Sequence, residues 1–284
     1  MTRLQLPSSL VDVDWLQRHL QHDDLLLFDA SWHMPATGRD ACAEWRQECI
    51  PGARFFDFDG KICDPHSALP HMLPDAALFT REVQALGLNQ DSSVVIYDSM
   101  GMFSSSRAWW MLRAMGCTRL ALLDGGLPAW KAAGFAVGSG DVETVNAPGN
   151  FSARLDGAQV ADAARVLAAL EDAETCVLDA RPEARFLGHA DEPRAGLRRG
   201  HMPGAVNLPF ASMFDQGLLK SRAEIEQIFK PLLAGRSSAI CSCGSGVTAC
   251  ILAFALHLIG NDQVAVYDGS WCEWGKPGEL PVVV

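Results

Sequence analysis

Short apolar runs recur along the chain, and segments with a helical pattern separate them. The runs cover residues 25–29, 93–97, 120–123, 176–179, 239–241 and 264–267. Continuous apolar runs bounded by turns are typical of strands in parallel sheets that are covered on both faces. Residues 106–115 and 247–258 are apolar on most sides, as buried crossover helices are. The pattern predicts an α/β protein with mostly parallel sheets and helices on both faces.

Several short motifs occur twice in the same order. The first copies are Phe28-Asp-Ala-Ser31, Ile50-Pro-Gly-Ala53 and Asp124-Gly-Gly-Leu-Pro-Ala-Trp130, and the second are Leu178-Asp-Ala-Arg181, Met202-Pro-Gly-Ala205 and Asp268-Gly-Ser-Trp-Cys-Glu-Trp274. The copies lie about 144 to 152 residues apart, which is the length of a domain. We therefore predict two copies of one fold, at 1–137 and 152–284, joined by a linker at 138–151 that is rich in Gly, Ser, Asn and Pro.

Composition limits the partners. The chain has 284 residues, 49% of them hydrophobic, so it can bury two ordinary cores. A net charge of -11 argues against nucleic acid as a partner. No run approaches the roughly 20 apolar residues that cross a bilayer, and the N-terminus lacks the pattern of a signal peptide, so we expect a cytoplasmic protein that does not bind a membrane. The nine scattered cysteines predict reduced thiols rather than a disulfide framework.

The two copies differ in the loop that follows one central strand. The second copy has Cys241-Ser-Cys-Gly-Ser-Gly-Val-Thr-Ala-Cys250, and the first has Tyr97-Asp-Ser-Met-Gly-Met-Phe-Ser-Ser-Ser106 without a cysteine. Duplicated folds often keep one working site, so we expect the C-terminal copy to be catalytic and the N-terminal copy to be inactive. Cys241 still belongs to the strand and is expected to be packed.

Cys243 is the predicted nucleophile. A cysteine at a strand end is more often a small buried apolar side chain. Here glycines at 244 and 246 permit backbone angles closed to other residues, just before a helix begins. The loop amides of Gly244, Gly246, Val247 and Thr248 can then point at the sulfur and favour the thiolate.

Two other kinds of cysteine site fit less well. A metal site would need a second Cys or His pair at zinc spacing beside Cys241 and Cys243, and none accompanies them, so we expect neither metal nor cofactor. A cysteine-dependent phosphatase would need an arginine six residues after the nucleophile, where this chain has Ala249.

The loop Cys243-Gly-Ser-Gly-Val-Thr-Ala249 resembles the active-site loop of the 3-mercaptopyruvate sulfurtransferases of the rhodanese superfamily, and the resemblance covers nearly the whole chain. It implies two tandem rhodanese-like domains and a persulfide on the C-terminal cysteine. Thiosulfate sulfurtransferases of the superfamily carry basic residues where this chain has Gly244 and Ser245. The neutral loop therefore favours a donor with one carboxylate.

The resemblance also implies roles for residues that composition and spacing do not select. Arg185 and Arg194 match the pair that holds the carboxylate and keto oxygen of the substrate. His71 and Asp59 match the partners that join Ser245 in a proton-handling triad. Taken alone, each arginine would be a solvated charge, and His71 and Asp59 would be turn residues.

The expected reaction is the transfer of sulfur from 3-mercaptopyruvate through a Cys243 persulfide to a thiol such as that of thioredoxin, or to cyanide, with release of pyruvate. The first alternative is a thiosulfate sulfurtransferase that uses the same cysteine. A further alternative is a non-catalytic rhodanese module that binds a protein or senses redox state, although such modules usually lack the loop cysteine that this chain has.

Overall fold

The computed structural model describes residues 3–140 and 147–284, which form two compact units. The first unit consists of Met1–Pro65 and Leu73–Leu155, and the second of His66–Met72 and Asp156–Val284. A short segment from the N-terminal half of the sequence thus belongs to the C-terminal unit. This segment contains His71.

The predicted linker, 138–151, falls partly on 141–146, which lie outside the described residues. Its last part packs with the first unit. The N–H groups of Gly149 and Phe151 donate to the carbonyl oxygens of Gln84 and Leu88, at 2.8 and 3.0 Å, and Phe151 is fully buried. The apolar side chain at 151 thus lies in the core of the first unit, which continues to Leu155.

The first unit is built on a five-stranded parallel sheet in the order β1-β5-β4-β2-β3. Its strands are β1 (Leu10–Val11), β2 (Leu25–Asp29), β3 (Arg54–Phe55), β4 (Ser93–Tyr97) and β5 (Leu120–Leu123). Its helices are α1 (Val13–His19), the 3-10 turn η1 (Pro35–Thr37), α2 (Ala41–Gln47), α3 (Ala76–Ala85), α4 (Ser105–Ala114) and α5 (Gly126–Ala132).

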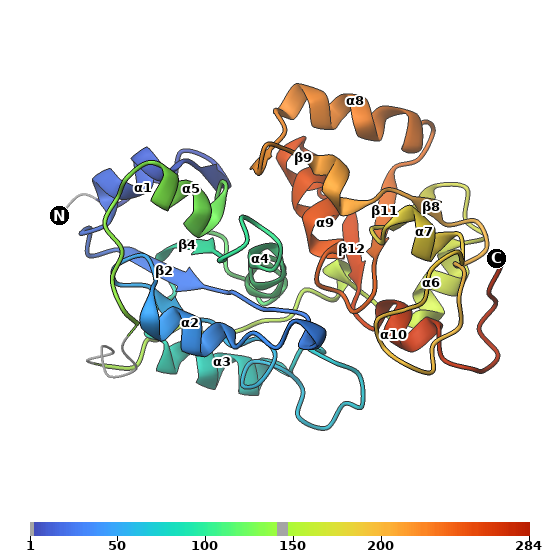
Figure 1. The fold of residues 1–284 in the computed structure, drawn as a ribbon, viewed down its shortest axis with the longest axis horizontal. Helices are drawn as coiled ribbons and strands as arrows, with labels where there is room; N and C mark the ends of the chain where they lie inside the picture. The colour runs from blue at the N-terminus through green and yellow to red at the C-terminus, as the bar shows by residue number, and fades with distance from the viewer. Residues whose placement is uncertain (1–2, 141–146) are drawn as a thin grey trace. The chain divides into compact units, whose positions relative to one another are not determined.

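Helices cover both faces of this sheet (Figure 1). Alternate side chains of β2, β4 and β5 point into one core, where they pack against Leu16 of α1, Trp45 of α2 and Trp130 of α5. On the other face, Phe28 contacts Phe56, which contacts Phe79 of α3. Because both faces are covered, the central strands are apolar except at an end residue such as Asp29 or Ser93, as the sequence pattern predicted.

The second unit repeats this topology, with a parallel sheet in the order β6-β12-β11-β7-β8. Its strands are β6 (Val160–Ala161), β7 (Thr175–Asp179), β8 (Val206–Asn207), β11 (Ser238–Ser242) and β12 (Val264–Tyr267), with a separate hairpin of β9 (Phe214–Asp215) and β10 (Leu218–Leu219). Its helices are η2 (Gly157–Gln159), α6 (Ala163–Ala169), α7 (Glu183–Phe186), η3 (Phe210–Met213), α8 (Arg222–Leu232), α9 (Ala249–Leu258) and α10 (Ser270–Trp274).

The predicted fold class is confirmed, and the duplication is visible in the registers. Asp29 at the end of β2 pairs with Tyr97, and Asp179 at the end of β7 pairs with Ser242. In the second unit α6 and α10 pack on one face of the sheet, and α9 contacts β11 and β12 (Figure 1). Within the described residues, no helix has the length and apolar character that crossing a bilayer requires.

Candidate active site

Cys243 lies where the sequence predicted it, directly after the central strand β11 and before α9. Its side chain is buried, and the loop around it is fastened to α10. The carbonyl oxygens of Cys243 and Gly244 accept hydrogen bonds from the N–H groups of Trp271 and Cys272, at 3.0 and 2.8 Å. In a trans peptide the C=O and the next N–H point in opposite directions. The amides of Gly244 and Ser245 therefore point away from α10.

Glycine is required at positions 246 and 244 of the loop for two different physical reasons. Gly246 has a φ of 76°, in the left-handed region that favours glycine. Gly244 is absent from the residues with positive φ, so the expectation of an unusual backbone there was wrong. Position 244 has glycine because a larger residue would lack space: a Cβ there would lie 3.0 Å from Nη2 of Arg185. Glycine at 244 therefore lets an arginine approach the loop next to the cysteine.

Ser270 holds the backbone of the cysteine, a role that the sequence analysis did not assign. The N–H of Cys243 donates to Ser270 Oγ at 3.1 Å, and Ser270 Oγ–H donates to the carbonyl oxygen of Tyr267 at 2.7 Å. Ser270 has a φ of 48°, in the region that non-glycine residues avoid, whereas the matching residue of the first unit is Gly126 with a φ of 54°. The sequence did contain one signal for this role: Ser270 stands at a turn position where the first copy has glycine.

Arg185 on α7 is held by Glu192, which the sequence analysis also missed. Arg185 Nε donates to Glu192 Oε2 at 3.1 Å, and its Nη2 donates to the same oxygen. The other oxygen of Glu192 accepts from Arg181 Nη1 at 2.7 Å, and the Glu192 side chain is only 2% exposed. A buried carboxylate shared by two arginines fixes the position of both guanidinium groups. The only sequence signal was an acid within an arginine-rich segment.

His71 lies within hydrogen-bond reach of the catalytic loop. Its Nε2 is 3.2 Å from Ser245 Oγ and 3.3 Å from Nη2 of Arg194. An arginine is always a donor, so Nε2 is the acceptor in the contact with Arg194. The Ser245 hydroxyl can then donate to the same nitrogen. The second unit thus brings together Ser245, His71 and Arg194 as a connected group.

His71 is itself in an unusual backbone conformation, with a φ of 53°, and is buried. Outliers of this kind in a buried loop are maintained by surrounding contacts and cluster at functional sites. The segment 66–72 therefore holds this imidazole next to Ser245 at a cost in backbone strain.

Asp59 belongs to the first unit, where its carboxylate accepts a hydrogen bond from the indole Nε1 of Trp32 at 2.9 Å. The carbonyl oxygen of Asp59 accepts from the thiol of Cys63 at 3.1 Å. The role of Asp59 in a triad stays a prediction.

The neighbouring cysteines differ from Cys243 in their surroundings. Cys241 lies in β11, fully buried, and burial raises the pKa of its thiol well above the ordinary value. Burial also raises the pKa of Cys272, while the positive charges of Arg194 and Arg185 act in the opposite sense. Cys272 on α10 therefore lies within electrostatic range of both arginines.

Two other arginines of the segment, Arg181 and Arg198, are structural. Arg181 is 1% exposed and pairs with Asp179 and Glu192, and its guanidinium stacks on Trp271 at 4.0 Å. Arg198 donates to the carbonyl oxygens of Trp274 and Leu280. These arginines hold the fold around the loop.

Comparison with known families agrees with this architecture. The rhodanese-like domain family matches residues 12–133 and 162–277, which gives one match for each predicted copy. The class of protein is therefore a tandem pair of rhodanese-like domains, with the cysteine loop in the second.

Curated relatives specify the class further. The chain is 41% identical to the mitochondrial thiosulfate/3-mercaptopyruvate sulfurtransferase 1 of Arabidopsis thaliana, over 96% of this chain and 77% of the relative. It is 39% identical to the 3-mercaptopyruvate sulfurtransferase of Escherichia coli K12, over 96% of both chains. The crystal structure of SseA from Escherichia coli, a 3-mercaptopyruvate sulfotransferase with the rhodanese fold, superposes with a TM-score of 0.83 at 37% identity, over 93% of this chain and 99% of that one. The chain belongs to the rhodanese family and, within it, to the two-domain 3-mercaptopyruvate sulfurtransferases.

Proposed function

We propose that the second unit transfers sulfur from 3-mercaptopyruvate to Cys243 and then to a thiol acceptor. The observation that carries the proposal is the assembly around one loop: the buried Cys243, the Arg185 guanidinium against Gly244, and Ser245 bonded to His71. Each part supplies one requirement of the reaction. Those requirements are a nucleophilic sulfur, a site for the carboxylate of the donor, and a path for one proton.

The donor binds through its carboxylate and keto oxygen. Arg185 and Arg194 present planar guanidinium groups, which match a planar oxygen edge better than a point charge does. The bond from Glu192 to Arg185 keeps that guanidinium oriented before the donor arrives.

In the first half-reaction, the Cys243 thiolate attacks the sulfur of the donor, and an S–S bond forms as the C–S bond breaks. The electron pair of the C–S bond goes to the donor carbon and gives the enolate of pyruvate. Ser245 passes the proton of the donor thiol to Nε2 of His71, and the same relay returns a proton to the enolate carbon, so that pyruvate leaves. Cys243 then carries the transferred sulfur as a persulfide.

In the second half-reaction, an acceptor thiolate attacks the outer sulfur of the persulfide and restores the Cys243 thiolate. A dithiol protein of the thioredoxin kind would take the sulfur and release it as sulfide, and cyanide would leave as thiocyanate.

Donor kinetics test the proposal. Arg185→Ala and Arg194→Ala should each lower kcat/KM for mercaptopyruvate by about ten- to a hundredfold, since each removes a charge-assisted hydrogen bond. Their activity with thiosulfate should fall less. Arg199→Ala is the matched control, because that arginine is exposed and pairs with the exposed Asp191.

Thiosulfate as the better donor of the unmodified protein would contradict the choice of mercaptopyruvate and favour the thiosulfate sulfurtransferase. Absence of turnover with either donor, in a folded protein supplied with a dithiol acceptor, would favour the non-catalytic module.

A further inference from the structure

Residues 280–284 lie against the segment that carries the donor-binding arginines. The N–H of His201 donates to the carbonyl oxygen of Val283 at 2.8 Å, and the N–H of Val283 donates to the carbonyl oxygen of His201 at 3.0 Å. Arg198 Nη2 donates to the carbonyl oxygen of Leu280 at 2.9 Å. These bonds join residues 280–284, which we call the C-terminal tail, to the end of the arginine segment, 185–201.

Two glycines of the arginine segment make room for the tail. Gly200 has a φ of 108°, and a Cβ on it would lie 2.1 Å from the carbonyl oxygen of Val283. Gly188 has a φ of 74°, and a Cβ on it would lie 2.6 Å from Cγ1 of Val284. The clash at 200 is with backbone, which cannot rotate away as a side chain can. The two glycines begin and end the loop that carries Arg194, so the tail lies against both ends of that loop.

Buried hydrogen bonds lead from the tail to the guanidinium of Arg185. The carbonyl oxygen of Gly200 accepts from Arg181 Nη2 at 2.9 Å, and Arg181 Nη1 donates to Glu192 Oε1 at 2.7 Å. Glu192 Oε2 accepts from Arg185 Nε at 3.1 Å. The side chains of Arg181 and Glu192 are 1% and 2% exposed, so little water competes for these bonds. A displacement of Gly200 is therefore passed on to Arg185.

The tail is also fixed to helix α10, which binds the catalytic loop. Trp274 Nε1 donates to the carbonyl oxygen of Pro281 at 2.7 Å, and Trp271 Nε1 donates to that of Arg198 at 2.9 Å. The N–H of Trp271 donates to the carbonyl oxygen of Cys243. One short helix thus contacts the nucleophile loop, the tail and the arginine segment, and it holds the arginines at a fixed place relative to Cys243.

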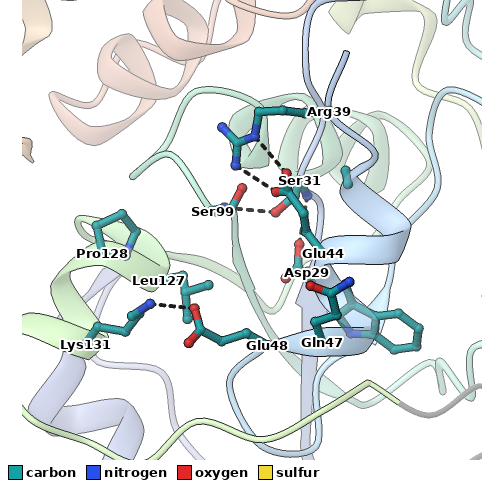
Figure 2. Close-up of a pocket in the computed structure, with 12 residues that line it drawn as sticks. Asp29, Ser31, Arg39, Glu44, Gln47, Glu48, Ser99, Leu127, Pro128 and Lys131 are labelled. Carbon is teal, nitrogen blue, oxygen red and sulfur yellow. Dashed lines mark hydrogen bonds and ion pairs between the residues drawn. The ribbon is translucent and has the colours of Figure 1, made fainter. Parts of the chain in front are cut away.

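The first unit has a matching bridge, between Cys49 and Gly138, but differs behind it. In the aligned repeats, Ser31 takes the place of the buried arginine, and Glu48 takes the place of the glycine under the tail. Figure 2 shows the result: the hydroxyl of Ser31 accepts from the N–H of a neighbouring serine, and Glu48 pairs with Lys131 on α5. Among the described residues, the bridge thus belongs to both copies, whereas its connection to a buried arginine belongs to the copy with the nucleophile.

We propose that the C-terminal tail positions Arg185 for the carboxylate of the donor, with Val283 and Gly200 as positioning residues. This role rests on the proposed function, in which Arg185 holds that carboxylate. A guanidinium forms two parallel hydrogen bonds with a carboxylate only when its plane is correctly oriented. Loss of the tail contact should therefore weaken donor binding and raise KM more than it lowers kcat.

Gly200→Ala is the direct test, because its methyl group would displace the carbonyl group of Val283. Gly204→Ala is the matched control: Gly204 has a φ of 83°, but a Cβ there would meet only the carbonyl oxygen of Leu170, at an ordinary 3.7 Å. The Nε–Hε signal of Arg185 in proton–nitrogen correlation spectra reports its position, and its absence in Arg185→Ala assigns it. We expect Gly200→Ala to move or broaden this signal and to raise KM for mercaptopyruvate about tenfold, with kcat within about threefold. Gly204→Ala should do neither.

Deletion of residues 282–284 is the second variant, and it removes the tail contact without adding a side chain at Gly200. It should have the same two effects. Val284→Ala is its control, because it keeps the two hydrogen bonds of Val283 with His201. An unmoved Arg185 signal in the folded variants, or equal effects in the controls, would overturn the proposal.

Double variants with Arg185→Ala separate positioning from a general loss of structure. If the tail acts through Arg185, Gly200→Ala should lower kcat/KM by no more than about twofold in that background. Losses that multiply would overturn the proposal. Failure of the unmodified protein to turn over mercaptopyruvate would refute the proposed function instead, and the Arg185 signal would still decide whether the tail holds this arginine.

Discussion

At the scale of single residues, Ser270 links backbone strain to the nucleophile. The first unit has glycine at this turn because a Cβ on Gly126 would lie 2.4 Å from the carbonyl oxygen of Asp98. The second unit has a serine in the same left-handed conformation, and its hydroxyl bonds to the N–H of Cys243. A left-handed non-glycine residue costs about 1 kcal/mol, so the hydroxyl offsets a real penalty.

Two substitutions separate the strain at Ser270 from its hydrogen bond. Ser270→Gly removes both, and Ser270→Ala removes only the bond, so the alanine variant should be less stable than the glycine variant by about 1 kcal/mol. Both should lower turnover, because both release the backbone of Cys243. Urea unfolding and steady-state kinetics check the two parts. Equal stabilities, or full activity in either variant, would contradict this role.

The two cysteines at 241 and 243 should behave oppositely. Cys243→Ser should abolish pyruvate release in a folded protein, because a serine hydroxyl is not ionised at neutral pH and can form no persulfide. Cys241→Ser should cost stability and little activity, because Cys241 is fully buried in β11. Pyruvate assays and unfolding curves of both variants test this contrast. Substantial turnover of Cys243→Ser would refute the mechanism.

At the scale of elements, the central strands and crossover helices were predictable from the sequence, and the short edge strands were not. Strands 25–29, 93–97, 120–123 and 264–267 agree with their predicted bounds, and the other two central strands are one residue longer at one or both ends. Strands β1, β3, β6 and β8 have two residues each, too few for a hydrophobic period. They form because the neighbouring strand offers hydrogen-bonding groups.

The candidate site was predictable only where its residues lie close together in the sequence. The loop of Cys243 is local in sequence, so glycine spacing and the divergence of the two copies identify it. The contact of His71 with Ser245 joins residues 174 positions apart, and only the resemblance to a family selected it. Glu192 and Ser270 act through side-chain hydrogen bonds that no local sequence pattern predicts.

The segment 66–72 and the loop after β11 should act as one relay. Ser245→Ala and His71→Ala should each lower turnover by about two to four orders of magnitude, the usual scale of acid–base assistance. The double variant should be little worse than the worse single variant, because the hydroxyl and the imidazole move the same proton. Steady-state kinetics of the three proteins give the result, and losses that multiply would argue for separate roles.

At the scale of the whole molecule, duplication produced two units whose equivalent aspartates are stabilised differently. Asp179 is paired with Arg181, whereas burial raises the pKa of Asp29 to about 6. The folded state therefore holds the proton of Asp29 at pH values where the unfolded chain has lost it. The contribution of Asp29 to stability is most favourable below about pH 4 and is lost as the pH rises to about 6.

Asp29→Asn should then gain stability relative to the unmodified protein between pH 4 and pH 6. A rise in pKa from 3.8 to about 6 corresponds to a gain of up to about 3 kcal/mol. Asp179→Asn is the matched control and should destabilise by about 3 to 5 kcal/mol at pH 5 and at pH 8, since it leaves Arg181 buried without its main partner. Urea unfolding at both pH values measures the difference. A pH-independent effect of Asp29→Asn would contradict the raised pKa.

The central claim is that Cys243 carries the transferred sulfur, and the mass of the protein tests it most directly. The reduced protein is exposed briefly to 3-mercaptopyruvate without an acceptor, and the peptides that contain Cys243 and Cys272 are weighed separately. The account predicts the mass of one added sulfur atom on the Cys243 peptide, its loss on addition of a dithiol, and no change on the Cys272 peptide. An unchanged Cys243 peptide in a protein that releases pyruvate, or added sulfur on another cysteine, would contradict it.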